Sequence, residues 1–195
     1  MLLRKGDFFM QKNTKSTKIS LFGSLKVMTM AAMLTAMSVV IGIFCKSFLN
    51  FGEGLYRITF ENLPILLSGI MFGPIVGGVV GAATDIISYL LSPQTYPINI
   101  IVTLGAAAVG LVSGVVSRYV LRKKTSARIV FSCLAAHAVG SMIIKPIGLF
   151  AFYGWAVLWR VPMYLVIAPI EIILICAMRR NSTAKKLIDG KGDTA

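Results

Sequence analysis

Residues 72–81 read FGPIVGGVVG, and this stretch contains no polar side chain. Gly73-Pro74 joins two apolar runs, 60–72 and 74–92, with no polar loop between them. Proline is accommodated in the first turn of a helix, and glycine commonly ends the preceding one. We therefore predict two helices joined by a tight turn.

Glycine spacing in the same region indicates how these helices pack. Gly73, Gly77 and Gly81 recur every four residues, and Gly110 and Gly114 repeat the spacing further along the chain. Small residues four apart let helix backbones approach closely where lipid offers no hydrophobic drive for association. We expect these glycines to serve internal helix packing.

Composition places the whole chain in a membrane. Its 195 residues are 56% hydrophobic and 14% charged, whereas soluble domains carry about 25% charged residues. The sequence predicts an all-α integral membrane protein with six transmembrane helices. Apolar runs place the helices at 20–44, 60–72, 74–92, 98–121, 127–150 and 161–179. The second run is shorter than the about 20 residues that span a bilayer, so we expect it to span marginally or to pack partly against protein.

The net charge of +13 predicts the orientation in the membrane. Lysine and arginine gather before the first run, in the 118–128 gap and after the last run, and such loops stay cytoplasmic. We therefore expect a multi-pass protein of a bacterial cell membrane with both termini on the cytoplasmic side. The connections 45–58, 92–98 and 151–160 are expected on the outer side. Lysine and arginine in loops that anchor the protein on the cytoplasmic side explain the charge better than nucleic-acid binding does. The sequence lacks the alternation of basic and aromatic residues that single-strand binders use.

These boundaries divide the chain into one membrane domain and two tails. We assign residues 1–19 to a basic cytoplasmic tail, 20–180 to the six-helix domain and 181–195 to a polar cytoplasmic tail.

Charged residues at membrane depth are candidates for function, because an unpaired charge there costs several kcal/mol. The predicted topology places five of them in the outer half of the bundle: Arg57, Glu61, Asp85, Lys145 and Arg160. Aromatic residues such as Phe60, Tyr96, Trp155 and Trp159 gather at the same level. They fit an interfacial belt, but their scarcity on the cytoplasmic side favours a ligand pocket walled by rings.

Catalysis is poorly supported by the sequence. His137 is the only histidine, and no metal-ligand pair or serine-nucleophile motif accompanies it, so we expect a hydrogen-bonded packing residue. The three cysteines are too scattered for a metal site or a disulfide framework. Without a GxxxxGK[ST] loop the chain cannot hydrolyse ATP by a P-loop mechanism. We expect no cofactor, and uphill transport would draw on a partner or on an ion gradient.

One block of sequence resembles a known family. Residues 57–65 (RITFENLPI), Gly69, the 72–81 stretch and Asp85 are similar to the folate-type substrate-binding (S) components of energy-coupling factor (ECF) vitamin transporters. The later run from Tyr96 through Asn99 to Gly105 and Gly110 shares this resemblance, which extends over roughly residues 25–180.

The resemblance implies a protein that binds a vitamin without chemistry. Such components are six-helix bundles in which the three outer connections cap the vitamin. They deliver it with a membrane coupling subunit (T component) and two cytoplasmic ATPase subunits, which fits the missing P-loop. The pair Ala32 and Ala36 matches the alanine stripe by which these components contact the T component.

Folate also fits the residue types of the predicted pocket. Its flat pterin ring would stack on Trp155, Trp159 or Phe60, and its polar edge would pair with Asp85 or Asn99. Its dianionic glutamate tail would meet Arg57, Lys145 and Arg160 in charge-assisted hydrogen bonds. A cationic vitamin such as thiamine would instead favour an excess of acids.

Three alternatives remain open from the sequence. The first is an S component for another water-soluble vitamin, such as riboflavin or thiamine. The second is an ion-coupled secondary carrier that uses Asp85, Glu171 and His137, although no inverted repeat is visible. The third is a membrane enzyme with Asp85 and His137 in catalytic roles.

Overall fold

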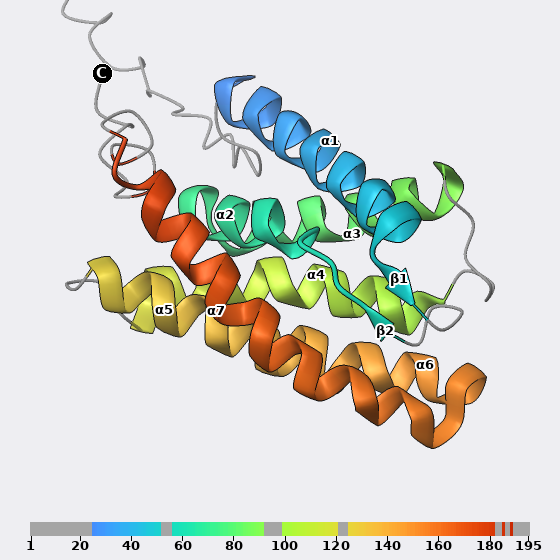
Figure 1. Ribbon diagram of the computed structural model, residues 1–195. Helices are drawn as coiled ribbons and strands as arrows, with labels where there is room; N and C mark the ends of the chain where they lie inside the picture. The colour runs from blue at the N-terminus through green and yellow to red at the C-terminus, as the bar shows by residue number, and fades with distance from the viewer. Residues whose placement is uncertain are drawn as a thin grey trace, which may run out of the picture.

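The computed structural model describes residues 25–51, 56–91, 99–120 and 125–181, together with 185 and 188. In chain order its elements are α1 (Leu25–Phe48), β1 (Asn50–Phe51), β2 (Tyr56–Arg57), α2 (Asn62–Phe72), α3 (Pro74–Leu91), α4 (Ile100–Val115), η1 (Val116–Val120), α5 (Thr125–Ala136), η2 (His137–Ile144), α6 (Lys145–Tyr153), η3 (Gly154–Trp159) and α7 (Arg160–Met178). η1 continues α4, and η2 and α6 continue α5. The described helices therefore form six continuous units, which we call rods: α1, α2, α3, α4–η1, α5–η2–α6 and α7 (Figure 1).

The predicted all-helical membrane fold is confirmed. Five helical stretches among the described residues are long and apolar enough to cross a bilayer: Leu25–Phe48, Pro74–Leu91, Ile100–Val120, Ser126–Trp159 and Val161–Met178. The sixth rod, α2, is too short to do so alone, and every residue from 62 to 70 is buried. It therefore packs against protein, as its short apolar run indicated.

The rods are arranged around α4. On one side α4 packs against α2 and α3, and on the other against α5, η2 and α6. The first helix, α1, covers α2 and α3, whereas α7 crosses over α5 and η2 (Figure 1).

The connections lie at two opposite ends of the bundle (Figure 1). The β1–β2 hairpin, the last turn of α3, the first turn of α4 and η3 gather at one end. The turn between α2 and α3 and the final turns of α7 lie at the other. This grouping agrees with the predicted alternation of helices. Which end faces the cytoplasm stays a prediction.

Glycine allows α2, α3 and α4 to meet backbone to backbone. A Cβ atom built on Gly77 would lie 2.4 Å from the carbonyl oxygen of Gly110, and one built on Gly69 would meet the same oxygen at 2.4 Å. Such distances exclude any side chain. The predicted role of this glycine spacing in internal packing is confirmed.

The tight turn between α2 and α3 also requires glycine. Gly73 has a φ of 99°, a left-handed conformation that glycine adopts without strain. Its neighbour Phe72 offers its carbonyl oxygen to Arg118, whose Nη2 donates a hydrogen bond of 2.8 Å. The free carbonyl at the end of α2 is thereby satisfied.

Two predicted connections are more regular than expected. The 45–58 segment was expected to be a loop, but α1 extends to Phe48 and two antiparallel strands follow, with Asn50 opposite Arg57. The 151–160 segment was also expected to be a loop. Instead α6 runs to Tyr153, a 3-10 turn occupies η3, and α7 begins at Arg160. Among the described residues, the Leu49 N–H bonds to the Cys45 carbonyl and the Ile58 N–H to the Leu49 carbonyl, which anchors the strands to the end of α1.

The predicted fifth helix is not a uniform α-helix. Residues 137–144 form a π-helix, and the Lys145 N–H bonds to the carbonyl of Gly140, five residues earlier. Pro146 follows directly and has no N–H to donate, so the ladder of α-helical hydrogen bonds cannot run unbroken through this point. Short π-helical segments within α-helices occur frequently at functional sites.

The glycine contacts yield a first prediction. Gly77→Ala should destabilise the protein by about 1–3 kcal/mol, because the added methyl group would force the α3 and α4 backbones apart. Thermal unfolding in detergent, followed by loss of the monodisperse gel-filtration peak, would measure the effect.

Gly78→Ala is the matched control. The nearest atom to a Cβ on Gly78 is 3.6 Å away, an ordinary contact. Its unfolding midpoint should equal that of the wild type. Equal stability of the two variants would contradict the close-approach argument.

Candidate ligand site near the β1–β2 hairpin

The candidate site is built around Lys145, which is 7% exposed. Its ammonium group donates to Asn62 Oδ1 at 3.3 Å and lies 3.8 Å from Glu61 Oε1. Glu61 and Asn62 stand at the start of α2, and Asn62 is completely buried. The cluster therefore joins two rods that are far apart in sequence and pairs a charge at membrane depth.

A second group of polar atoms extends the cluster toward α1 and α3. A Cβ on Gly42 of α1 would meet Glu61 Oε2 at 2.8 Å and Ser88 Oγ at 3.5 Å, so these two oxygens lie on the same side of α1. Lys46 Nζ donates to the Ser88 carbonyl at 3.3 Å. Four rods (α1, α2, α3 and α6) thus contribute polar groups to one region, which we call the Lys145 cluster.

Local backbone structure places Lys145 in the cluster. The π-helical turn ends at Lys145, and its side-chain stem crosses α4 at Gly105, where a Cβ would lie 2.7 Å from Lys145 Cγ. One turn earlier, Gly140 packs against the same helix, with its own Cβ position 2.7 Å from the Gly105 carbonyl oxygen. The absence of side chains at both glycines allows η2 and α4 to approach.

Asp85 and Asn99 are engaged by neighbouring helices. Thr103 Oγ1 of α4 donates to Asp85 Oδ2 at 2.7 Å, which ties α3 to α4. Asn99 caps α4, because its Oδ1 accepts from the Ile101 N–H at 2.9 Å, and its Nδ2 donates to the Gly148 carbonyl at 2.6 Å. The amide of Asn99 thus links the start of α4 to α6 with both of its polar atoms.

The predicted aromatic residues are spread over different surroundings. Phe60 is half-buried just before the Lys145 cluster begins. Trp155 and Trp159 lie on η3 and are 77% and 63% exposed. The Trp155 ring contacts Phe150 edge-on, with 5.5 Å between centroids. Exposure of this degree is typical of an interfacial belt, so contact of either tryptophan with a ligand stays a prediction.

Two predicted site residues are described only in part, and a third is not described. Arg57 lies on β2 and Arg160 begins α7, both at the end of the bundle where η3 lies, but their side chains are outside the described part of the structure. Tyr96 lies outside the described residues altogether.

His137 forms a second buried polar pair. Its Nε2 is 2.6 Å from Glu171 Oε2, and the two side chains are 1% and 0% exposed. The ring of Tyr164 lies against the imidazole, with centroids 6.1 Å apart. This contact joins η2 to α7, and the expectation of a hydrogen-bonded packing histidine is confirmed.

The comparisons with known proteins agree with this architecture. The sequence profile of the family described as "ECF transporter, substrate-specific component" matches residues 26–188. This chain belongs to that family. Members of it are transport binding proteins that work with T and ATPase modules, so the interpretation as a membrane enzyme is wrong.

Two proteins that are similar to this chain both carry the name FolT. The folate transporter FolT of Clostridium novyi (strain NT) is 34% identical over 59 residues, which span 30% of this chain and only 34% of that protein. A crystal structure of FolT bound with folic acid superposes with a TM-score of 0.61 at 25% identity, covering 77% of this chain and 90% of that one.

Several residues of the S component's polar cluster were not among the predicted site residues. Glu61 was recognised only as a charge at membrane depth, and Lys46, Asn62 and Ser88 were not among the predicted site residues. Thr84 and Ser88 are one helical turn apart on α3, and both are buried. A polar pair at that spacing in an apolar run was an available signal, since residues four apart share a helix face.

The cluster suits binding rather than chemistry. Among the described residues no three His, Cys, Asp or Glu side chains lie together in a way that could hold a metal ion. Lysine is a point charge with three donors and no acceptor, and asparagine has both donors and acceptors. Groups of these types can hold carboxylate and amide groups of a small molecule.

The buried His137–Glu171 pair yields a second prediction. His137→Leu should destabilise the fold by about 3–5 kcal/mol, because it leaves a carboxylate buried without its partner. The double variant His137→Leu/Glu171→Leu should be closer to the wild type, since no uncompensated charge then remains. Thermal unfolding of the two variants and of Glu171→Leu would measure the coupling. Additive effects of the two single changes would contradict a direct pair.

Proposed function

We propose that this S component binds folate, or a closely related vitamin, at the outer end of the bundle. The likeness to FolT bound with folic acid, over 90% of that chain, carries this proposal. The partial match to the folate transporter of Clostridium novyi supports it independently of the fold.

The chemistry of the Lys145 cluster supports an anionic ligand. Of the three donors on the Lys145 ammonium, one reaches Asn62 Oδ1, whereas Glu61 Oε1 at 3.8 Å is beyond the usual hydrogen-bond distance of about 3.2 Å. A carboxylate of the glutamate tail would therefore gain a charge-assisted bond without breaking a short one. Arg57 and Arg160 are the further cations that we assign to this tail.

Polar groups for the pterin edge are also present. Asp85 accepts a hydrogen bond from Thr103 through Oδ2. Asn62 and Ser88 are buried, and the structure gives their Nδ2 and Oγ atoms no hydrogen-bond partner. A buried polar atom without a partner costs free energy, so a ligand that pairs with these atoms gains affinity from them. We assign the stacking of the pterin ring to Phe60, Tyr96, Trp155 and Trp159.

Burial of Lys145 has a consequence for access. With 7% of Lys145 exposed, a ligand reaches the ammonium only when the elements around it part. We propose that the β1–β2 hairpin and η3, which lie at this end of the bundle (Figure 1), open for entry and close over the bound vitamin.

Folate binding is tested by calorimetry on the purified chain. Lys145→Met should weaken folate binding by about 10- to 100-fold, the loss expected for one hydrogen bond to a charged group. Lys26→Met is the control, because Lys26 is an exposed lysine near the start of α1, at the opposite end of that helix from Lys46. It should bind as the wild type does.

The same titrations test the proposed folate specificity independently of membership in the S-component family. If the wild type fails to bind folate and binds riboflavin or thiamine tightly, the proposed folate specificity is wrong. Accumulation of folate by the chain alone in sealed vesicles under a pH gradient would instead favour the ion-coupled carrier.

The surface of α1 supports a docking site for the T component. Ala32 and Ala36 are exposed, whereas the buried face of α1 is formed by other residues, among them Ala31, Thr35 and Val39. A stripe of small side chains at an exposed helix face lets a second helix approach closely. We propose that this stripe contacts the T component of the complex, which also contains two cytoplasmic ATPase subunits.

Substitutions on α1 test this docking site. Ala36→Trp should leave folate binding unchanged and abolish uptake by the assembled complex, because the added bulk blocks helix contact. Met37→Trp, at an exposed position about 100° around the helix from Ala36 and not three or four residues from either alanine, should preserve both activities. Loss of folate binding in Ala36→Trp would show that the stripe supports the fold instead.

A further inference from the structure

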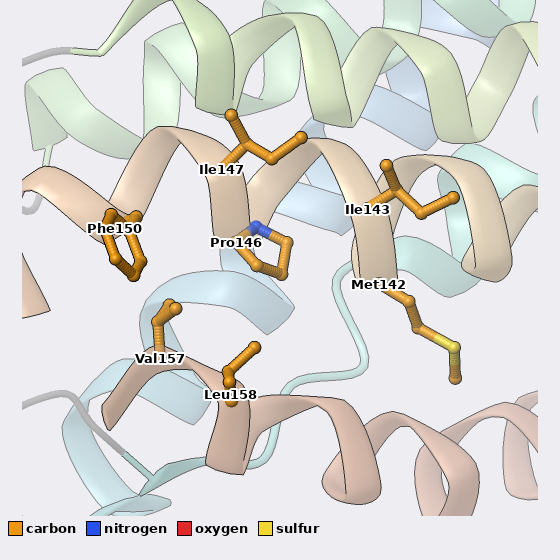
Figure 2. A pocket seen from close by; sticks show the side chains of 7 residues that line it. All are labelled: Met142, Ile143, Pro146, Ile147, Phe150, Val157 and Leu158. Atoms are coloured by element: carbon orange, nitrogen blue, oxygen red, sulfur yellow. The ribbon is translucent and has the colours of Figure 1, made fainter. Parts of the chain in front are cut away.

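An apolar pocket of about 480 Å³ lies between the rod formed by η2 and α6 and the 3-10 turn η3 (Figure 2). Met142 and Ile143 contribute from η2, and Pro146, Ile147 and Phe150 from α6. Val157 and Leu158 of η3 form the opposite wall. In Figure 2, Pro146 on one wall and Val157 and Leu158 on the other lie toward the space between the walls.

The composition of this pocket excludes the transported vitamin as its occupant. Its seven lining residues are all apolar, and none offers a charged, hydroxyl or amide side chain. A site for a small polar molecule needs a few placed polar groups, and the carboxylates of folate would lose their hydration there without compensation. Hydrocarbon is the chemistry that this lining accommodates.

The pocket is continuous with the surface that lipid covers. Ile143, Ile147 and Leu158 line it and are 50–62% exposed. They belong to the helical stretch Ser126–Trp159, which is long and apolar enough to cross the membrane. In a membrane protein, exposed apolar side chains on a spanning helix face acyl chains, so we expect the pocket to open toward lipid and not toward water.

The backbone explains why a hollow exists here. Gly154 has a φ of 55° and turns the chain sharply after α6. The chain then returns as the 3-10 turn η3, with Val157 almost fully buried and packed near Leu149 and Tyr153. The two walls are joined at this turn (Figure 1), and the pocket lies between them (Figure 2).

We propose that a single acyl chain of a membrane phospholipid occupies this pocket and holds η3 against α6. The headgroup of that lipid lies at the level of Trp155 and Trp159, in accordance with the preference of tryptophan for the headgroup region. The bound lipid completes the packing of the connection that leads into α7.

Native mass spectrometry of the detergent-purified chain tests the proposal. The wild type should retain one phospholipid. Leu158→Phe and Ile147→Phe, one from each wall, should lower the retained fraction on the order of five- to tenfold, since each larger side chain fills part of the space that the acyl chain needs. Leu165→Phe makes the same change at a position on α7 that is 65% exposed and does not line the pocket. It should retain lipid as the wild type does.

Tryptophan fluorescence gives a second and independent readout. The chain contains two tryptophans, both on η3, and Trp155 contacts Phe150 at the edge of the pocket. In detergent, phospholipid with brominated acyl chains should quench their emission with saturation near one lipid per protein. The Leu158→Phe variant should lose this saturable phase, and the Leu165→Phe variant should keep it.

Four results would overturn the proposal. They are a wild type without retained lipid, equal retention in pocket and control variants, displacement of the lipid by folic acid, and a lipid-free dimer that covers the pocket. Failure of folate binding alone leaves the lipid site unaffected, so the two proposals fail separately.

Discussion

Backbone contact between α3 and α4 at Gly77 and Gly110 is the constraint on which the remaining architecture depends. A methyl group at Gly77 would lie 2.4 Å from a carbonyl oxygen of the facing helix, so only glycine permits the observed separation. Gly69 brings the short helix α2 against the same carbonyl. With these three helices held together, the start of α2 is carried into the bundle, where Glu61 and Asn62 meet Lys145.

The same principle operates on the other side of α4. Gly105 and Gly140 let η2 approach, and the stem of Lys145 crosses α4 at Gly105. The charge on Lys145 is tolerated because the opposing acid and amide come from α2, which α4 holds in place from its other face. Helix packing and the polar cluster are therefore parts of one arrangement, in which glycine supplies the proximity and the buried pair compensates the desolvation of charge.

The sequence predicted the six helices, but it did not predict the π-helical segment or the β1–β2 hairpin. Hydropathy predicted the helices to within a few residues, and the spacing of Gly77 and Gly81 correctly indicated internal contact. The π-helical turn before Lys145 was missed because hydropathy locates a helical run and does not distinguish i→i+5 from i→i+4 hydrogen bonding within it. The β1–β2 hairpin was missed although residues 52–55 read GEGL, a composition typical of turns.

The site was predicted in part for a physical reason. Lys145 and Asp85 stood out because charge is expensive in lipid. Asn62 and Ser88 did not, because a neutral polar residue is tolerated in a membrane helix and only its neighbours in space decide its role. Trp155 and Trp159 were chosen for their residue type, and the structure places them at 77% and 63% exposure. Pairwise contacts such as Lys145–Asn62 join residues far apart in the chain and are not encoded in any local pattern.

The shortness of α2 bears on how the protein is made. At about 1.5 Å per residue its 11 residues extend roughly 16 Å, half of the about 30 Å hydrocarbon layer. A segment of that length, which also carries an asparagine, is too short to insert across the bilayer by itself. Because Gly73 joins α2 directly to α3, we expect these two helices to enter the bilayer together as a hairpin.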